Sequence, residues 1–90
     1  MIKKLTAMPY AQAHVKIDNN GNIFLISYKT LVASIDKDGW IQCRGLYSRT
    51  TIRHISATAS EYTPFDYYTF KRLYLDKIIM NMYSGEVVPL

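Results

Sequence analysis

Apolar and polar side chains alternate strictly over residues 11–17, and residues 40–47 also follow an alternating pattern. A period of two residues is typical of a strand with one buried face and one wet face. Residues 23–28 and 30–35 are instead continuous β-prone runs, which favours a more central place in a sheet. Because no glycine, proline or asparagine separates these two runs, they are either two strands or one long bent strand.

Two dipeptides predict the turns of this sheet. Asn20-Gly21 and Asp38-Gly39 both favour tight turns between strands, because their residues tolerate positive φ. The sequence therefore predicts an antiparallel sheet over residues 11–47. Residues 1–10 show no clear period and are expected to form a tail or an edge segment.

The period changes to that of a helix after the sheet. Ser48 or Thr50 suits the N-cap, where a hydroxyl accepts a hydrogen bond from a free amide of the first turn. Thr63-Pro64 ends this helix, because proline disfavours a helical backbone in the residue before it. A second helix is predicted over residues 66–83, with Gly85 as its stop signal. The apolar face of the first helix is formed by Ile52, Ile55, Ala59 and Tyr62.

Strands that precede helices define an α+β fold. The sequence predicts one domain, an antiparallel three- to four-stranded meander followed by two C-terminal helices packed on one face. The helices occupy residues 48–83, and residues 84–90 form a tail. The core of a 90-residue chain is small, so association with a second copy is expected to add stability.

The predicted second helix carries more apolar surface than one sheet covers. Leu73 and Met80 lie nearly opposite its main apolar stripe, and Phe70 widens the stripe toward them. Either the segment Ile2–Tyr10 covers this second side or, as the favoured alternative, the helix forms a symmetric homodimer. The stripe expected to lie on the sheet comprises Tyr67, Tyr74, Leu75, Ile78, Ile79 and Met82. The predicted dimer or partner interface consists of Tyr67, Phe70, Leu73, Tyr74 and Met80.

The net charge of +4 is concentrated in the first 60 residues, where eight basic side chains accompany only three acidic ones. From Gly39 to Ser60 there are three arginines and no acid. Such a stretch is either the footprint of a polyanion or acidic protein partner, or an ordinary solvated face. Five of the eight tyrosines lie in the last third of the chain, and tyrosine is common at interfaces.

A candidate anion-binding or partner-binding site lies where the first helix begins. Most helices place acidic residues in the first turn, whereas this one has hydroxyl groups and two arginines four residues apart. Free amides, hydroxyls and guanidinium groups suit a phosphate or a partner's carboxylate. The alternative is a plain hydroxyl cap with solvated arginines. The candidate residues are Arg44, Ser48, Arg49, Thr50, Thr51, Arg53 and His54.

The sequence predicts neither an enzyme nor a metal site. Cys43 and Ser48 are the nearest nucleophile candidates to His54, and no carboxylate lies nearby along the chain. A buried structural cysteine and a hydrogen-bonded histidine are therefore favoured over a Cys-His pair. His14 and His54 are too few for a metal site, and no cofactor is predicted. A single cysteine fits a reducing, cytoplasmic setting, and no apolar run is long enough to span a membrane.

Two segments resemble a family of small domains that occur in phages and other mobile elements of bacteria. The first is Ser27–Ala33, a strand of the pattern Ser-Tyr-x-Thr-x-Val-Ala. The second is Tyr47–Ile55, where Tyr-Ser-x-Thr-Thr-x-x-His-Ile opens a helix. The resemblance covers residues 23–62. It implies a phage or plasmid accessory protein, assigns no reaction, and marks as one unit Tyr47, Ser48, Thr50, Thr51 and His54.

These features predict a small, non-enzymatic binding protein from a phage or mobile element, located in the cytoplasm of the host cell. It is expected to occupy a surface of a host macromolecule, with a protein favoured over a nucleic acid, as an anti-CRISPR-like inhibitor of host defence does. The alternative is a nucleic-acid-binding accessory or regulatory protein. Its phosphate contacts would come from Lys29, Arg44, Arg49 and Arg53.

Overall fold

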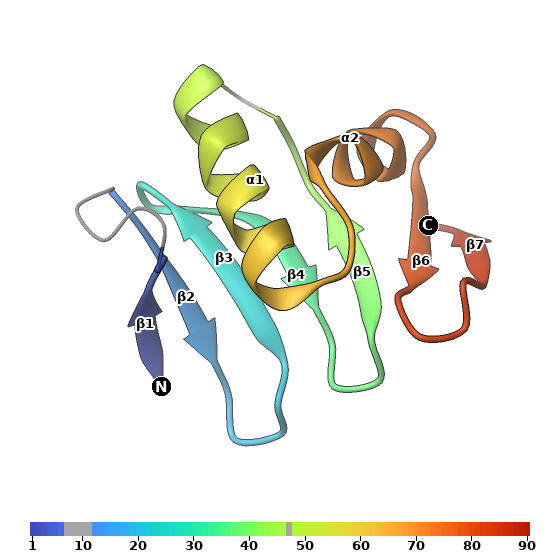
Figure 1. Ribbon diagram of the computed structural model, residues 1–90, viewed down its shortest axis with the longest axis horizontal. Helices are drawn as coiled ribbons and strands as arrows, with labels where there is room; N and C mark the ends of the chain where they lie inside the picture. The colour runs from blue at the N-terminus through green and yellow to red at the C-terminus, as the bar shows by residue number, and fades with distance from the viewer. Residues whose placement is uncertain (7–11, 47) are drawn as a thin grey trace.

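The computed structural model describes residues 1–6, 12–46 and 48–90. In these residues the strands form one antiparallel seven-stranded sheet in the order β1-β2-β3-β4-β5-β6-β7, and both helices lie on the same face of it (Figure 1). The elements in chain order are β1 (Ile2–Lys4), β2 (Ala13–Ile17), β3 (Ile23–Ser27), β4 (Thr30–Ile35), β5 (Trp40–Cys43), α1 (Arg49–Tyr62), α2 (Tyr67–Leu75), β6 (Ile78–Asn81) and β7 (Val87–Pro89).

The predicted three- to four-stranded meander followed by two helices is wrong. The described residues form seven strands, and two of them, β6 and β7, come after the helices. Both helices are therefore inserted between strands that are neighbours in the sheet, since β6 pairs with β5. At the other edge, β1 pairs with β2. Part of each segment predicted as a possible tail, residues 1–10 and 84–90, thus forms an edge strand.

The second helix begins as predicted but ends much earlier. The carboxylate of Asp66 caps α2 by accepting a hydrogen bond from the Thr69 amide at 3.3 Å. The helix ends at Leu75, and Lys77 has a φ of 53°, a left-handed conformation that stops a helix. The residues after it pair with β5 and β7. Apolar positions over residues 78–82 fit a helical stripe on paper, but the β-branched pair Ile-Ile also favours a strand.

Replacement of Lys77 by glycine is expected to stabilise the protein by about 0.5–1 kcal/mol, because glycine adopts positive φ without steric cost. The matched control is Lys71→Gly in the middle of α2, which is expected to destabilise the protein by about 1 kcal/mol. Urea unfolding of the two variants measures both changes. A loss of stability in Lys77→Gly as large as that in Lys71→Gly would mean that the helix continues through this position.

The two predicted turns are confirmed, and they are copies of each other. The sequence Ile-Asp-x-x-Gly-x-Ile occurs at Ile17–Ile23, between β2 and β3, and at Ile35–Ile41, between β4 and β5. In each copy the aspartate carboxylate accepts hydrogen bonds from the backbone amides two and four residues later, at 2.9–3.0 Å. The glycines have φ values of 90° and 93°. The copies touch, since the Lys37 amide donates to Oδ1 of Asn22 at 2.9 Å.

The runs over residues 23–35 are two strands. Tyr28 and Lys29 form the turn between β3 and β4, and Tyr28 adopts a φ of 59°. The Tyr28 amide donates a hydrogen bond to the Gln12 carbonyl at 2.6 Å. Tyr28 is therefore held in a conformation that nothing in its residue type signals.

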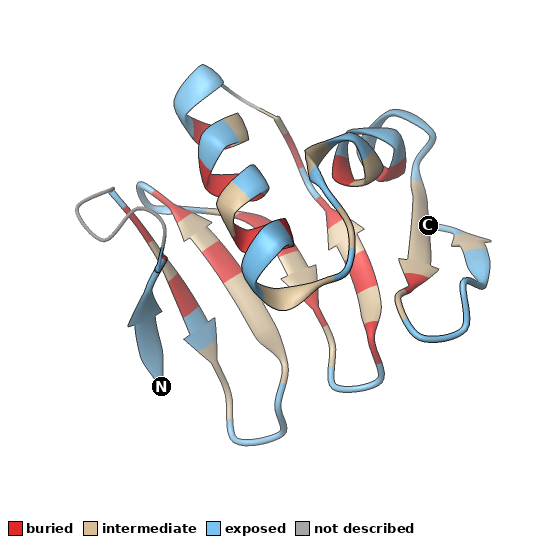
Figure 2. Cartoon of the chain, viewed as in Figure 1, coloured by how far each residue is buried: buried red, intermediate tan, exposed pale blue. Residues whose placement is uncertain are grey.

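The core lies between the sheet and the two helices, and buried residues gather where the helices lie on the strands (Figure 2). Leu5, which follows β1, is fully buried in this core. The N-terminal segment thus covers part of the apolar surface, and residues 7–11 lie outside the described residues. The buried side chains of the strands and helices include Val15, Leu25, Ala33, Ile41, Cys43, Ile55, Ala59, Phe70 and Leu73.

Candidate binding surfaces and a buried histidine

The motif at the start of the first helix forms a buried hydrogen-bond cluster. Thr51 and His54 are 3% and 0% exposed. Nδ1 of His54 lies 2.8 Å from Oγ of Ser27 at the end of β3, and Oγ1 of Thr51 lies 3.4 Å from the same oxygen. Ser48 is the N-cap, as predicted, and its Oγ accepts a hydrogen bond from the Thr51 amide at 3.2 Å. The cluster fastens the beginning of α1 to the end of β3.

One atom of this cluster has no hydrogen-bond partner among the described residues. Nε2 of His54 is buried and unpaired there. Burial lowers the pKa of His54, because desolvation disfavours the charged imidazolium. The ring of Tyr28 packs beside the imidazole, with ring centroids 6.0 Å apart. These surroundings disfavour the charged form of His54, whose ring lies in the cluster that joins α1 to β3.

Cys43 is unsuited to nucleophilic chemistry. Its side chain is buried, and the thiol donates to the Gly45 carbonyl at a sulfur–oxygen distance of 3.9 Å. Burial raises the pKa of this thiol to about 11, so the reactive thiolate is scarce at neutral pH. His54 bonds to Ser27 instead, and Ser27 is itself only 2% exposed. These contacts agree with the interpretation of Cys43 and His54 as structural residues.

The exposed part of the predicted anion site lies at one end of the sheet. Arg49 and Thr50 stand on the first turn of α1, Arg53 follows one turn later, and all three are exposed. Arg44 follows β5, and Lys29 lies in the β3–β4 turn, at the same end as the start of α1 (Figure 1). Four basic side chains from three different parts of the fold therefore stand at this end of the molecule.

The structure divides the candidate anion site rather than joining it. Thr51 and His54 are buried, and the hydroxyl of Ser48 is used by the helix cap. Tyr47 lies outside the described residues. The ion pair found in the described part of the chain joins Arg72 to Asp76 on α2, at 3.4 Å. The exposed arginines of the site thus have no carboxylate partner in that part, and they remain available to an external anion.

The predicted partner interface on the second helix differs more from the structure than the other predicted sites do. Phe70 and Leu73 are 0% and 2% exposed and pack in the core, so they cannot form an outer surface of the folded chain. Met80 lies on β6, and Tyr67 is half-buried. Of the five predicted interface residues, Tyr74 is the one classed as exposed, at 40%. The prediction placed Leu73 opposite the sheet because it assumed that one helix runs to residue 83. In the structure α2 ends at Leu75, and Leu73 packs in the core.

Two apolar grooves flank α2. One has a volume of about 300 Å³ and lies between α2 and the strands β6 and β7. The other has a volume of about 490 Å³ and lies between the end of α2, the end of β5 and the C-terminus. Exposed large hydrophobic side chains line both, Tyr68 and Val87 in the first and Tyr74, Leu75 and Leu90 in the second. We call these two grooves together the α2 surface.

The α2 surface does not follow from the predicted elements, because β6 and β7 are not among them. The sequence gives only a weak signal for these strands, two short and mainly apolar segments, residues 78–82 and 87–90, on either side of Ser84-Gly85. Ser84-Gly85 is typical of a helix end, whereas in the structure it belongs to the β6–β7 turn. The Asn81 side chain organises this turn by accepting hydrogen bonds from the amides of Tyr83 and Ser84 at 2.9 and 3.1 Å.

Neither a membrane span nor a metal centre is seen in the described ranges. None of the helices there is long and apolar enough to cross a membrane. No group of three or more histidine, cysteine, aspartate or glutamate side chains is placed to hold a metal ion within those same residues.

The chain belongs to a family of unknown function, DUF8033. Residues 2–79 match this family, a range that includes β1 to α2 and the start of β6. No curated protein and no solved structure shows significant similarity to the chain.

Proposed function

We propose that this protein is a small, non-enzymatic binding protein that attaches to a partner protein through the α2 surface. The observation that carries the proposal is the concentration of exposed hydrophobic side chains there. Five of the nine exposed large hydrophobic side chains found in the described residues line its two grooves. Exposed apolar side chains gathered around one helix are typical of interfaces.

The charges around the α2 surface indicate the character of the partner. Arg44 and Lys77 line the larger groove, and Arg72 lines the smaller one. A partner that inserts apolar or aromatic side chains and carries acidic groups around them therefore fits this surface best. The predicted homodimer would instead place these basic side chains against their own copies, and sedimentation measures whether it forms.

The setting rests on the resemblance to small phage and mobile-element domains. It supports a cytoplasmic protein of the host cell that blocks a host macromolecule, as an anti-CRISPR-like inhibitor does. The burial of Cys43 and of the Ser27–His54 pair supports the non-enzymatic part of the proposal, since each of these side chains is at most 2% exposed.

The double substitution Tyr68→Ala with Leu75→Ala is expected to weaken partner binding at least tenfold, because tyrosine anchors in interfaces contribute about 2 kcal/mol or more. Both side chains are exposed, at 72% and 59%, so the fold is expected to tolerate the change. The measurement is quantitative capture of the partner from host-cell lysate. Ile2→Ala is the matched control, because Ile2 is similarly exposed at 68% but lies on β1. An equal loss in the control and the double variant would contradict the proposal.

A further inference from the structure

Among the described residues, no helix covers the face of the sheet opposite α1 and α2 (Figure 1), and the side chains of this face follow from the strand register. Val15, Leu25, Ala33 and Cys43 pair with one another across four strands and are buried under the helices. Because successive side chains of a strand point to opposite faces, the next row points away from the helices. That row contains Lys16 and Phe24, which are paired in register. We call this side the open face.

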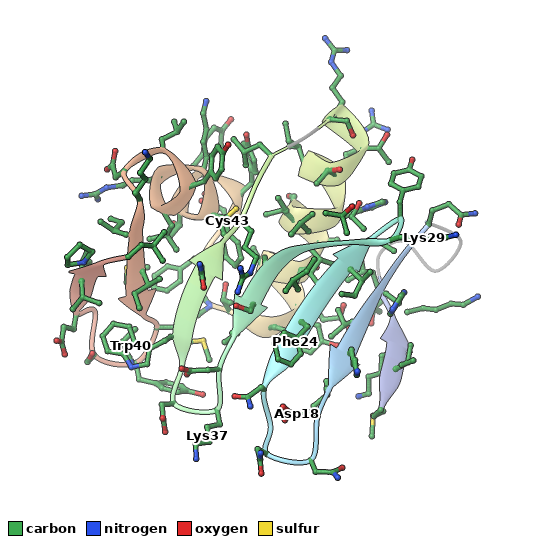
Figure 3. The ribbon with its side chains drawn as sticks, turned by 180° about the vertical axis from the view of Figure 1, so that it is seen from behind. Asp18, Phe24, Lys29, Lys37, Trp40 and Cys43 are labelled. Atoms are coloured by element: carbon green, nitrogen blue, oxygen red, sulfur yellow. The ribbon has the colours of Figure 1, made fainter. Side chains whose placement is uncertain are left out.

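The open face combines basic and aromatic side chains. Lys4 and His14 are paired in register on the same side as Lys16 and Phe24. Trp40, on β5, also lies on this side, because its neighbour Ile41 is fully buried under the helices. Figure 3 shows the molecule from this side, with Phe24 and Trp40 labelled on it and Lys29 at one end. Both aromatic side chains are half-buried, so part of each ring is accessible.

The charged side chains of this face are basic. None of the described strands contains an aspartate or a glutamate, and two lysines of β1 and β2, Lys4 and Lys16, lie on this face. Asp18 and Asp36 lie in the turns next to Phe24 and Trp40, where their carboxylates accept backbone hydrogen bonds. A polyanion that lies over the strands themselves therefore meets cations and aromatic rings, and no carboxylate of the described strands.

We propose that the open face binds single-stranded nucleic acid, with bases stacked on Phe24 and Trp40 and phosphates bound by Lys4 and Lys16. Proteins that bind single strands combine a basic track with aromatic side chains, since every base offers a flat face for stacking. A broad sheet face does not fit the major groove of a duplex, which admits a helix or a two-stranded ribbon. This surface is separate from the α2 surface, so the proposal stands or falls independently of the protein-binding function.

Trp40 is the single tryptophan of the chain, so its fluorescence reports directly on this face. Titration with an oligonucleotide of about 15 nucleotides, as single-stranded DNA and as single-stranded RNA, is expected to quench this fluorescence. Affinity is expected to fall by at least tenfold between about 50 mM and about 200 mM salt. Absence of binding at the lower salt concentration would overturn the proposal, and so would tighter binding of the corresponding duplex.

Substitutions separate the open face from the basic end of the molecule. Phe24→Leu keeps an apolar side chain but removes the ring, and it is expected to weaken binding about tenfold. Lys16→Gln is expected to reduce the salt dependence by about one phosphate contact, whereas Lys71→Gln on α2 is the matched control and leaves it unchanged. Binding that survives the first two variants but is abolished by Arg49→Glu with Arg53→Glu would place the site at the start of α1 and overturn the proposal.

Discussion

Leu73→Ala is expected to lower the free energy of unfolding by about 2–4 kcal/mol, whereas Leu75→Ala is expected to lower it by less than about 0.5 kcal/mol. The two leucines stand two residues apart on α2 and differ in burial, at 2% and 59% exposed. Truncation of the buried side chain removes its contacts and leaves a cavity in the core. Truncation of the exposed side chain removes few contacts and leaves no cavity in the core. Urea unfolding of the two single variants measures the difference.

This pair of variants tests where the second helix ends. A helix that continues to residue 83 would place Leu75 on the sheet and Leu73 on the opposite side, and the two costs would then be reversed. The short helix, stopped at Lys77 with its left-handed φ of 53°, predicts the larger cost for Leu73. Phe70→Ala is an independent check. Truncation of this fully buried ring is expected to lower the free energy of unfolding by about 3–5 kcal/mol.

Acidification below neutral pH is expected to destabilise the protein through His54. Burial lowers the pKa of His54 below its ordinary value of 6.5, so the unfolded chain binds a proton that the folded chain resists. The contribution of His54 to stability is therefore fully present above about pH 6.5 and is lost as the pH falls toward the lower folded-state pKa. The free energy of unfolding is therefore expected to decrease between about pH 7.5 and about pH 5.

The variant that checks this effect is His54→Gln, in which the pH dependence in this window is expected to disappear. The matched control is His14→Gln on β2, which is expected to retain it. Hydrogen bonds from Asn22 lower the pKa of Asp18 below 3.8, so protonation of that carboxylate lies outside the window. Stability curves of His54→Gln that still fall with the wild-type slope would show that another group is responsible.

Much of the central sheet could be predicted from the sequence because its turns depend on local chemistry. Asp18 and Asp36 each bind the amides of their own turn, and the glycine of each turn adopts positive φ. A seven-residue pattern is therefore sufficient to form each turn. The caps at Ser48 and Asp66 were predictable for the same reason. Each of these features needs only neighbours within four residues.

The strands β6 and β7 depend on distant partners, and for this reason they could not be predicted from the sequence. Ile78–Asn81 becomes a strand because β5 and β7 offer hydrogen bonds on both sides. Periodicity along the chain does not contain that information. The signal that ends α2 is equally weak, since lysine does not indicate a left-handed conformation as glycine does.

The residues of the candidate site could be predicted from the sequence, but which of them are buried and which are exposed could not. The motif that begins at Ser48 was expected to present hydroxyls and basic groups together. The structure turns Thr51 and His54 inward to Ser27 and leaves the arginines outside. A helix with a three- to four-residue repeat buries one side and exposes the other, and which side faces the sheet depends on contacts far away in the sequence.

Site-specific photo-crosslinking in host-cell lysate is the most direct test of the claim that a partner protein binds the α2 surface. A photoreactive side chain is introduced in place of Tyr68 in one variant, and in place of Ser56, an exposed residue of α1, in another. Binding through the α2 surface predicts one specific crosslinked protein, or a crosslinked homodimer, from position 68 and none from position 56. Crosslinks from position 56 but not from position 68 would contradict it.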